Sequence, residues 1–128
     1  MKLLVDAHAL IWSVDQPGAL SVTARDALAD AANALLVSIG TIWEISIKSG
    51  LGRLTLSQPF RPWIERAIRD LGASVVPLSI AAADGQAQLP HHHRDPFDRM
   101  LVAQSQIESA SIVSRDGAFD TYGIQQIW

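Results

Sequence analysis

Short apolar runs alternate with helical patterns along the whole chain. Residues 3–5, 34–38, 74–78 and 111–114 have the length and side chains of buried strands, and residues 124–127 indicate a fifth strand at a sheet edge. Helical patterns fall between these runs, over residues 7–12, from 20–21 onward, and over 41–49, 60–71, 79–89 and 96–108. This alternation predicts an α/β fold with a mostly parallel sheet of four to five strands covered by helices.

Several helix ends can be placed from single residues. Ser21 is a suitable N-cap for the second helix, and Gly50 and Gly72 are expected to end the helices that precede them. Pro96 favours the first position of a helix, so Asp95 is predicted as its N-cap and Asp98 as its third residue.

The composition favours one packed domain. The chain has 128 residues, 48% hydrophobic and 18% charged, which suits a single globule over residues 1–128. It contains no cysteine, so disulfides and thiolate metal sites are excluded. Asp6 interrupts the first apolar run, and no run approaches the ~20 apolar residues of a membrane span. We therefore expect a cytoplasmic protein without membrane contact.

Four carboxylates lie where strand-like runs end or the next helix begins: Asp6, Glu44, Asp98 and Asp116. In a parallel sheet the carboxyl ends of the strands face one crevice, so these acids can converge there. Clustered carboxylates repel one another unless a hard cation is present, and oxygen ligands suit Mg²⁺ or Mn²⁺. The pattern indicates metal-dependent chemistry on a phosphate. The net charge of −3 gives no basic footprint for nucleic acid, but a bound cation would reverse the local sign.

Each acid also has a structural explanation. Asp6 could simply cap the following helix. Glu44 could form an exposed i, i+4 pair with Lys48, worth only ~0.3–0.5 kcal/mol. Asp95 and Asp98 would both be favourable at the positive end of a helix dipole. A non-catalytic α/β interaction module whose strand-end acids are helix caps therefore stays open as an alternative.

Two other phosphate-handling classes fit poorly. A receiver domain needs a lysine after a late strand, and the only lysines are Lys2 and Lys48. A haloacid-dehalogenase-type phosphatase needs a second Asp two residues after its nucleophile, where this chain has His8.

The histidines and tryptophans add little chemistry. His91, His92 and His93 suggest a zinc tract, but adjacent side chains cannot easily face one ion, so a loop or a phosphate-contacting rim is favoured. His8 either supports the acids or packs against the sheet, with packing slightly favoured. The four tryptophans are expected in the core or at interfaces.

Four segments, taken in order, resemble PIN-domain proteins of the VapC toxin type. They are residues 4–12 (LVDAHALIW), 42–48 (IWEISIK), 93–104 (HRDPFDRMLVAQ) and 114–119 (SRDGAF). The resemblance extends over the whole chain. One departure is Ala7, where the family often has threonine; this affects no metal ligand.

The resemblance implies a three-layer α/β/α fold and a Mg²⁺-dependent endoribonuclease, with Mn²⁺ as a substitute, acting as the toxin of a type II toxin–antitoxin pair. It places the catalytic and metal-binding acids at Asp6, Glu44, Asp98 and Asp116, with Asp6 and Asp98 the firmest ligands. Supporting roles fall to Asp95, Ser114 and Arg99, and Ser114 is expected to fix Asp116 by a hydrogen bond.

The same resemblance implies an RNA substrate, a VapB-like antitoxin and a homodimer. Cationic side chains near the acidic motifs are candidate RNA contacts: Lys48, Arg53, Arg94, Arg99 and Arg115. Arg99 and Arg115 could equally pair with the acids. Trp12, Ile42 and Trp43 are candidates for protein contacts.

Overall fold

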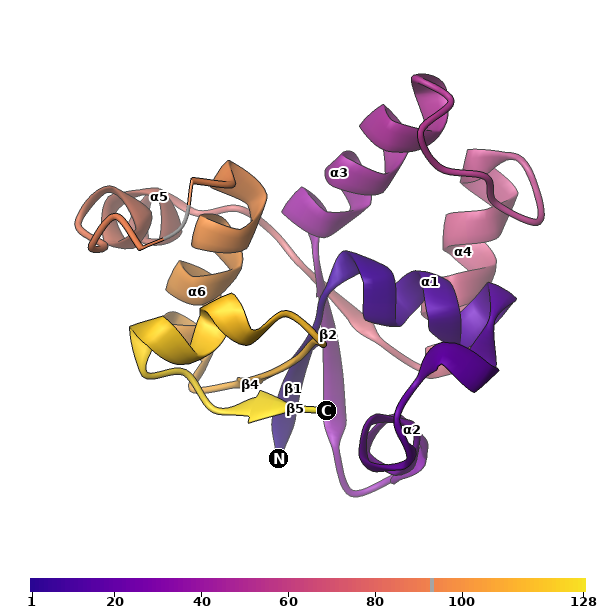
Figure 1. Ribbon diagram of the computed structural model, residues 1–128, viewed down its shortest axis with the longest axis horizontal. Helices are drawn as coiled ribbons and strands as arrows, with labels where there is room; N and C mark the ends of the chain where they lie inside the picture. The colour runs from indigo at the N-terminus through magenta and orange to yellow at the C-terminus, as the bar shows by residue number, and fades with distance from the viewer. Residues whose placement is uncertain (93) are drawn as a thin grey trace.

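A five-stranded parallel sheet forms the centre of the molecule (Figure 1). The computed structural model describes residues 1–92 and 94–128. The strands are β1 (Lys2–Val5), β2 (Ala34–Ser38), β3 (Ser74–Val76), β4 (Ser111–Val113) and β5 (Gln126–Ile127), in the spatial order β3-β2-β1-β4-β5. Each neighbouring pair is parallel, with Leu3 opposite Leu35 on one side and Ser111 on the other. The predicted α/β fold is confirmed.

Six α-helices connect and cover the strands. They are α1 (Ala7–Asp15), α2 (Val22–Ala29), α3 (Ile39–Gly50), α4 (Phe60–Leu71), α5 (Ile80–Ala87) and α6 (Pro96–Glu108). Two short 3₁₀ helices, η1 (Pro17–Ala19) and η2 (Gly117–Tyr122), were not predicted from the sequence pattern. In the described part of the chain, no helix combines the length and apolar character needed to cross a membrane.

The strand residues alternate between two apolar layers. Leu3 and Val5 belong to the core packed under α1, α2 and α4, whereas Leu4 belongs to the core that contains Leu101 and Val102 of α6. Figure 1 shows the same division, with α5 and α6 on one side of the sheet and α1, α2 and α4 on the other. Successive strand residues point to opposite faces, so strands covered on both sides are nearly continuous apolar runs. The expected three-layer arrangement is present.

The strand order reverses at the centre of the sheet. From β1 the chain continues through β2 and β3 to one edge, and then returns through β4 and β5 to the other. The backbone N–H of Asp6 donates to the carbonyl of Val113 (3.2 Å), which extends the β1–β4 pairing to the strand ends. A crevice is expected at this topological switch point.

The helix ends that single residues were expected to fix agree with the structure except at α3. Of the other predicted ends, α1 extends beyond residue 12 to Asp15, and α5 is shorter than the predicted 79–89. Ser21 and Asp95 are N-caps as predicted, and Gly72 ends α4 in the left-handed region with φ 64°. The prediction that Gly50 ends α3 is wrong, since the helix includes Gly50 and the left-handed residue is Gly52, with φ 72°. Helix α3 also begins two residues before the predicted Thr41, because Ser38 caps it through the N–H of Gly40 (3.0 Å).

Two hydrogen bonds explain the later end of α3. The Arg53 N–H donates to the Lys48 carbonyl (2.9 Å), and the Gly52 N–H donates to the Ser49 carbonyl (3.1 Å). This pair of bonds is the Schellman motif, which requires a left-handed residue where Gly52 lies. The motif folds the chain back and holds Arg53 beside the last turns of α3.

Candidate active site

An acidic pocket lies at the switch point of the sheet. It has a volume of about 280 Å³ and is lined by Asp6, Ala7, His8, Glu44, Lys48, Asp95, Asp98 and Asp116. The four predicted acids therefore meet in one place, although they come from four separate parts of the chain. The structure adds Asp95, the cation Lys48 and the imidazole of His8 to the same lining.

Asp6 follows β1 directly and caps α1. Its Oδ1 accepts a hydrogen bond from the Ala9 N–H (2.8 Å), and its side chain is bonded by the Ser114 hydroxyl. Asp6 is only 8% exposed. Burial raises the pKa of this carboxyl, and the hydrogen bonds from Ser114 and Ala9 only partly oppose that effect. A cation in the pocket would stabilise its ionised form.

Ser114 connects two of the acids. Its hydroxyl oxygen accepts a hydrogen bond from the backbone N–H of Asp116 (3.0 Å), which is the contact expected from the sequence. Its bond to Asp6 was not expected, because only the register that sets Val5 opposite Val113 brings Ser114 beside Asp6. Asp116 is exposed, and its Oδ1 caps η2 through the N–H of Ala118 (2.9 Å).

Glu44 and Lys48 form an ion pair inside the pocket. The Lys48 Nζ lies 2.7 Å from the Glu44 Oε2, one helical turn away on α3. The hydrogen bond to Glu44 raises the pKa of Lys48 despite partial burial, and the charges of Asp95 and Asp98 act in the same direction. The i, i+4 pair considered from the sequence is present, but Glu44 is only 6% exposed and faces the other acids.

Asp95 and Asp98 occupy the two helix positions predicted for them, the N-cap and the third residue of α6. The Asp95 Oδ1 accepts hydrogen bonds from the N–H groups of Phe97 (2.8 Å) and Asp98 (3.3 Å), which makes it the N-cap of α6. Asp98 lies in the first turn of the same helix, and both carboxylates line the pocket.

The donor set fits a hydrated divalent cation. The pocket offers carboxylate oxygens, which suit Mg²⁺ or Mn²⁺. Among the described residues, however, no three carboxylate or imidazole groups lie close enough to hold one ion together. Mg²⁺ usually keeps several waters and takes only one or two carboxylates directly. The open pocket accommodates such an ion better than it would a dehydrated one.

Arg99 was considered as a supporting residue, an RNA contact or a partner of the acids. Its side chain is 5% exposed, and its guanidinium donates to the carbonyls of Pro90 (2.8 Å), Gln86 (2.9 Å) and Leu89 (3.3 Å). These bonds argue against the RNA contact, because its donors hold the backbone that leads out of α5; the supporting role stays a prediction. The candidate contacts Arg53, Arg94 and Arg115 are exposed.

The three histidines that the structure describes lie outside the core. His8 is exposed on the pocket lining, with its ring centroid 5.5 Å from that of Trp12, so the slightly favoured packing against the sheet is wrong. The ring of His92 lies 5.2 Å from that of Tyr122. The zinc interpretation also involves His93, which lies outside the described residues.

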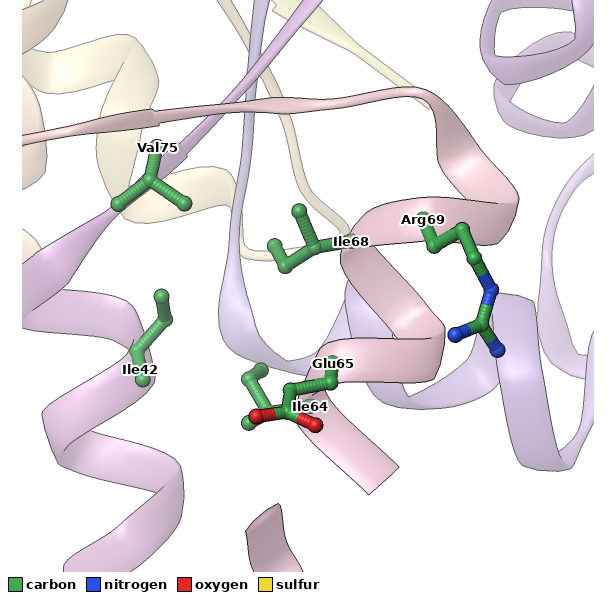
Figure 2. Close-up of a pocket in the computed structure, with 6 residues that line it drawn as sticks. All are labelled: Ile42, Ile64, Glu65, Ile68, Arg69 and Val75. Carbon is green, nitrogen blue, oxygen red and sulfur yellow. The ribbon is translucent and has the colours of Figure 1, made fainter. Parts of the chain in front are cut away.

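A larger apolar groove lies away from the acids, between α3, α4 and β3. It has a volume of about 380 Å³ and is lined by Ile42, Ile64, Glu65, Ile68, Arg69 and Val75. Figure 2 shows the isoleucines and Val75 around the groove, with Arg69 directed away from Ile42 and Val75. Ile42 was one of the residues expected to contact a protein.

Comparison with known proteins agrees with this architecture. The family model described as PIN domain matches residues 3–124. No curated protein matches the chain in sequence. Among solved structures, the chain is similar to VapBC2 from Rickettsia felis bound to a DNA fragment from their promoter, with a TM-score of 0.72 and 10% identity over 98% of this chain and 97% of that one.

Two further structures have the same fold. FitAB bound to the IR36 DNA fragment has a TM-score of 0.64 and 19% identity over 97% of this chain and 92% of that one. FitAcB from Neisseria gonorrhoeae has a TM-score of 0.63 and 17% identity over 97% of this chain and 95% of that one.

Proposed function

The chain belongs to the PIN-domain family, and from this membership we propose that it is a Mg²⁺-dependent endoribonuclease, the toxin of a type II toxin–antitoxin pair. The observation that carries the proposal is the position of Glu44. Helix capping accounts for Asp6, Asp95 and Asp116, each of which accepts a backbone N–H at the start of a helix. Glu44 lies in the middle of α3, caps nothing, and is nevertheless buried facing those acids. A buried carboxylate is costly unless it is paired or binds a cation. The pair with Lys48 supplies one positive charge to Glu44, but five carboxylates line the pocket, so the lining as a whole stays acidic and favours a bound cation.

The proposed roles follow from the positions of the side chains. Asp6 and Asp98 would hold the ion most directly, and Glu44 and Asp116 would complete the site directly or through water. Ser114 would fix the positions of Asp6 and Asp116 relative to each other by its two hydrogen bonds. The chemistry that such an ion supplies is activation of a water for attack on an RNA phosphodiester and stabilisation of charge on the leaving oxygen.

The proposed antitoxin is VapB-like and binds through the apolar groove of Figure 2. The complexes named VapBC2 and FitAB have the same fold in a chain of similar length. The groove exposes aliphatic side chains with Glu65 and Arg69 at its lining, which suits a segment that has apolar anchors and charges of both signs.

A homodimer is proposed through the other side of α3. Trp43 is 58% exposed and packs edge-on against Phe97 of α6, with ring centroids 5.6 Å apart. The two rings border an apolar pocket of about 290 Å³ that also includes Leu78 and Met100. Exposed apolar surface of this kind is typical of protein contacts. Light scattering should give a dimer mass for the wild type and a monomer mass for Trp43→Glu; equal masses would place the contact elsewhere.

The experiment that tests the catalytic proposal is cleavage of single-stranded RNA with Mg²⁺, with Mn²⁺ and with excess EDTA. We expect cleavage with either metal and none in EDTA. Asp98→Asn should lose most of the activity, whereas Asp120→Asn should keep it, because Asp120 is exposed and is not part of the pocket lining. Undiminished cleavage in the chelator would overturn the metal mechanism.

Mn²⁺ titration calorimetry separates the enzyme from the alternative, a non-catalytic module with capping acids. The enzyme should bind Mn²⁺, and Asp6→Asn should weaken that binding. A wild-type protein that binds no Mn²⁺ and cleaves no RNA would favour the interaction module.

A further inference from the structure

A second pocket adjoins the acidic one at the end of α3. Its volume is about 210 Å³, and it shares Ala7, His8 and Lys48 with the acidic pocket. The rest of its lining is Ile11, Ile45, Arg53 and Leu54. The two pockets therefore form one continuous surface, acidic at one end and both apolar and cationic at the other.

A backbone hydrogen bond links the two cationic residues of the second pocket. The Schellman motif ties the Arg53 N–H to the Lys48 carbonyl (2.9 Å), so the two cationic residues stay next to each other. Arg53 is exposed, and the Lys48 side chain is 39% exposed, so both can meet an anion from solvent. Ile11 and Ile45 are buried and form a fixed apolar floor.

The charge pattern indicates what this surface receives. The acidic pocket repels a phosphate backbone, so a nucleic acid that reaches it needs cations close by. Within the described lining of the two pockets, the full positive charges belong to Lys48 and Arg53. An apolar floor beside a phosphate-binding cation suits the base and sugar of an unpaired nucleotide. The volume is below the roughly 300–1,000 Å³ of pockets that enclose drug-sized ligands, which suits a single nucleotide unit.

We propose that this second pocket is the subsite for the nucleotide that adjoins the scissile phosphodiester in single-stranded RNA. The phosphate of that nucleotide lies against Arg53 and Lys48, and its base and sugar lie against Ile11 and Leu54, above the fully buried Ile45. This assignment rests on the proposed ribonuclease function. Arg53 is thus a substrate-positioning residue that lies outside the acidic cluster.

The first test measures binding without cleavage. Short labelled oligouridine and oligoadenosine are titrated with the protein in EDTA at several salt concentrations. Arg53→Gln should weaken binding about two- to fivefold, the range of an exposed ion pair. It should also reduce the slope of log affinity against log salt by about 0.7, the value for one phosphate contact on a single strand. Arg53→Lys should restore most of the slope, because the charge is kept.

Two controls identify the cause of any change. Arg25→Gln removes an exposed arginine from α2, at the opposite end of the molecule from α3 (Figure 1), and should alter neither affinity nor slope. Leu54→Ala should weaken binding without changing the slope, and its melting temperature is measured to exclude loss of folding. Wild-type affinity and slope in Arg53→Gln would overturn the proposal. Unchanged RNA binding combined with weaker antitoxin binding would also overturn it, since the pocket would then be a protein contact.

Cleavage in Mg²⁺ separates this inference from the function on which it rests. If the wild type cleaves RNA and Arg53→Gln binds and cleaves equally well, the subsite is wrong and the nuclease stands. If Arg53→Gln loses affinity and slope while the wild type cleaves nothing, RNA binding at this pocket stands, but the nuclease, and with it the position next to a scissile phosphodiester, is wrong.

Discussion

Asp6 combines a capping role with an unfavourable charge, and its substitution should separate the two. Its folded-state pKa is raised above the ordinary value of 3.8, chiefly by burial. Without metal, its contribution to stability is therefore greatest below that ordinary value and is lost as the pH rises through the folded-state pKa. Asp6→Asn keeps an equally good cap and removes the charge, so it should be more stable than the wild type near neutral pH, by on the order of 1 kcal/mol.

Urea denaturation in EDTA at about pH 7 and at about pH 3.5, below the ordinary pKa of the carboxyl, would test this prediction. The extra free energy of unfolding of Asp6→Asn over the wild type should vanish at the lower pH. Asp6→Ala is the control, because it also loses the bond to the Ala9 N–H and should fall about 1 kcal/mol below Asp6→Asn. A gain that is the same at both pH values would mean that charge is not its cause.

The neighbouring acids of α6 allow a similar comparison. Asp95→Asn should keep substantial RNA cleavage, because Asn accepts the Phe97 and Asp98 N–H groups as well as Asp does. Asp98→Asn should lose most of the cleavage yet melt at or above the wild-type temperature, since removing one of several like charges relieves repulsion. Cleavage rates and melting temperatures of the two variants would test both expectations. Equal inactivation would show that Asp95 does more than cap the helix.

The sequence identified the acids of the pocket but not their partners. Asp6, Asp98 and Asp116 could be found because each follows a strand-like run or begins a helix, and such positions converge in a parallel sheet. Glu44 lies in the middle of α3 and was identified only together with these acids. The bond between Ser114 and Asp6 depends on strand register, which no local pattern contains. Arg99 was misjudged for a related reason: its neighbours in sequence are acids, but its neighbours in space are carbonyl oxygens.

At the scale of elements, Asp15 joins three segments that the sequence pattern does not relate. Its carboxylate at the end of α1 accepts hydrogen bonds from the Ser57 N–H (3.0 Å), the Ser57 hydroxyl (2.5 Å) and the Trp63 Nε1 of α4 (3.1 Å). Partial burial acts against these bonds, but together they hold the pKa of Asp15 below its ordinary value of 3.8. Its contribution to stability is thus present above pH 3.8 and is lost as the pH falls through the lowered pKa.

Asp15→Ala should accordingly lose about 1–2 kcal/mol near neutral pH, as expected for hydrogen bonds to a charged group that is only partly buried. The loss should shrink when urea denaturation is repeated at successively lower pH below 3.8, because the wild-type carboxylate is protonated as the pH falls through its lowered pKa. Asp15→Asn, which keeps an acceptor oxygen, should lose less than Asp15→Ala. A loss independent of pH would mean that packing alone, and no charge, ties α1 to α4.

Element boundaries were predictable where one residue fixes them. Phe60–Leu71 and Pro96–Glu108 match the predicted helices because a left-handed Gly72 ends the first and an Asp-Pro pair begins the second. Helix α3 differed because two glycines compete for its end, and the bonds of Arg53 and Gly52 select the later one. The 3₁₀ helices have only three and six residues, too few to show an apolar period, so periodicity could not reveal them.

At the scale of the whole molecule, the negative pocket should couple metal binding to inhibition. Lys48 already places an ammonium 2.7 Å from Glu44, so a cationic side chain can sit among these acids. We expect an arginine of the proposed antitoxin to enter the same pocket, because its planar fork binds carboxylates bidentately. Antitoxin and Mn²⁺ would then compete, and each would weaken the other by the same factor.

Antitoxin affinity measured across a Mn²⁺ titration, for the wild type and Asp6→Asn, would check this coupling. Affinity for the wild type should fall as Mn²⁺ rises, and Asp6→Asn should bind the antitoxin more weakly and respond less to the metal. If antitoxin affinity changes neither with Mn²⁺ concentration nor with the substitution, the antitoxin binds wholly outside the acidic pocket.

The central position of β1 also governs when the pocket can form during synthesis. Strand β1 pairs with β4, which joins Leu3 to Ser111 across most of the chain, and Asp116 lies beyond β4. Such contacts between distant residues form slowly, because a long loop must close before they are made. A nascent chain on the ribosome can build β1, α1 and β2 early, but its acids meet only after residue 116 has emerged. The proposed site therefore cannot assemble while only the part of the chain before residue 116 has been synthesised.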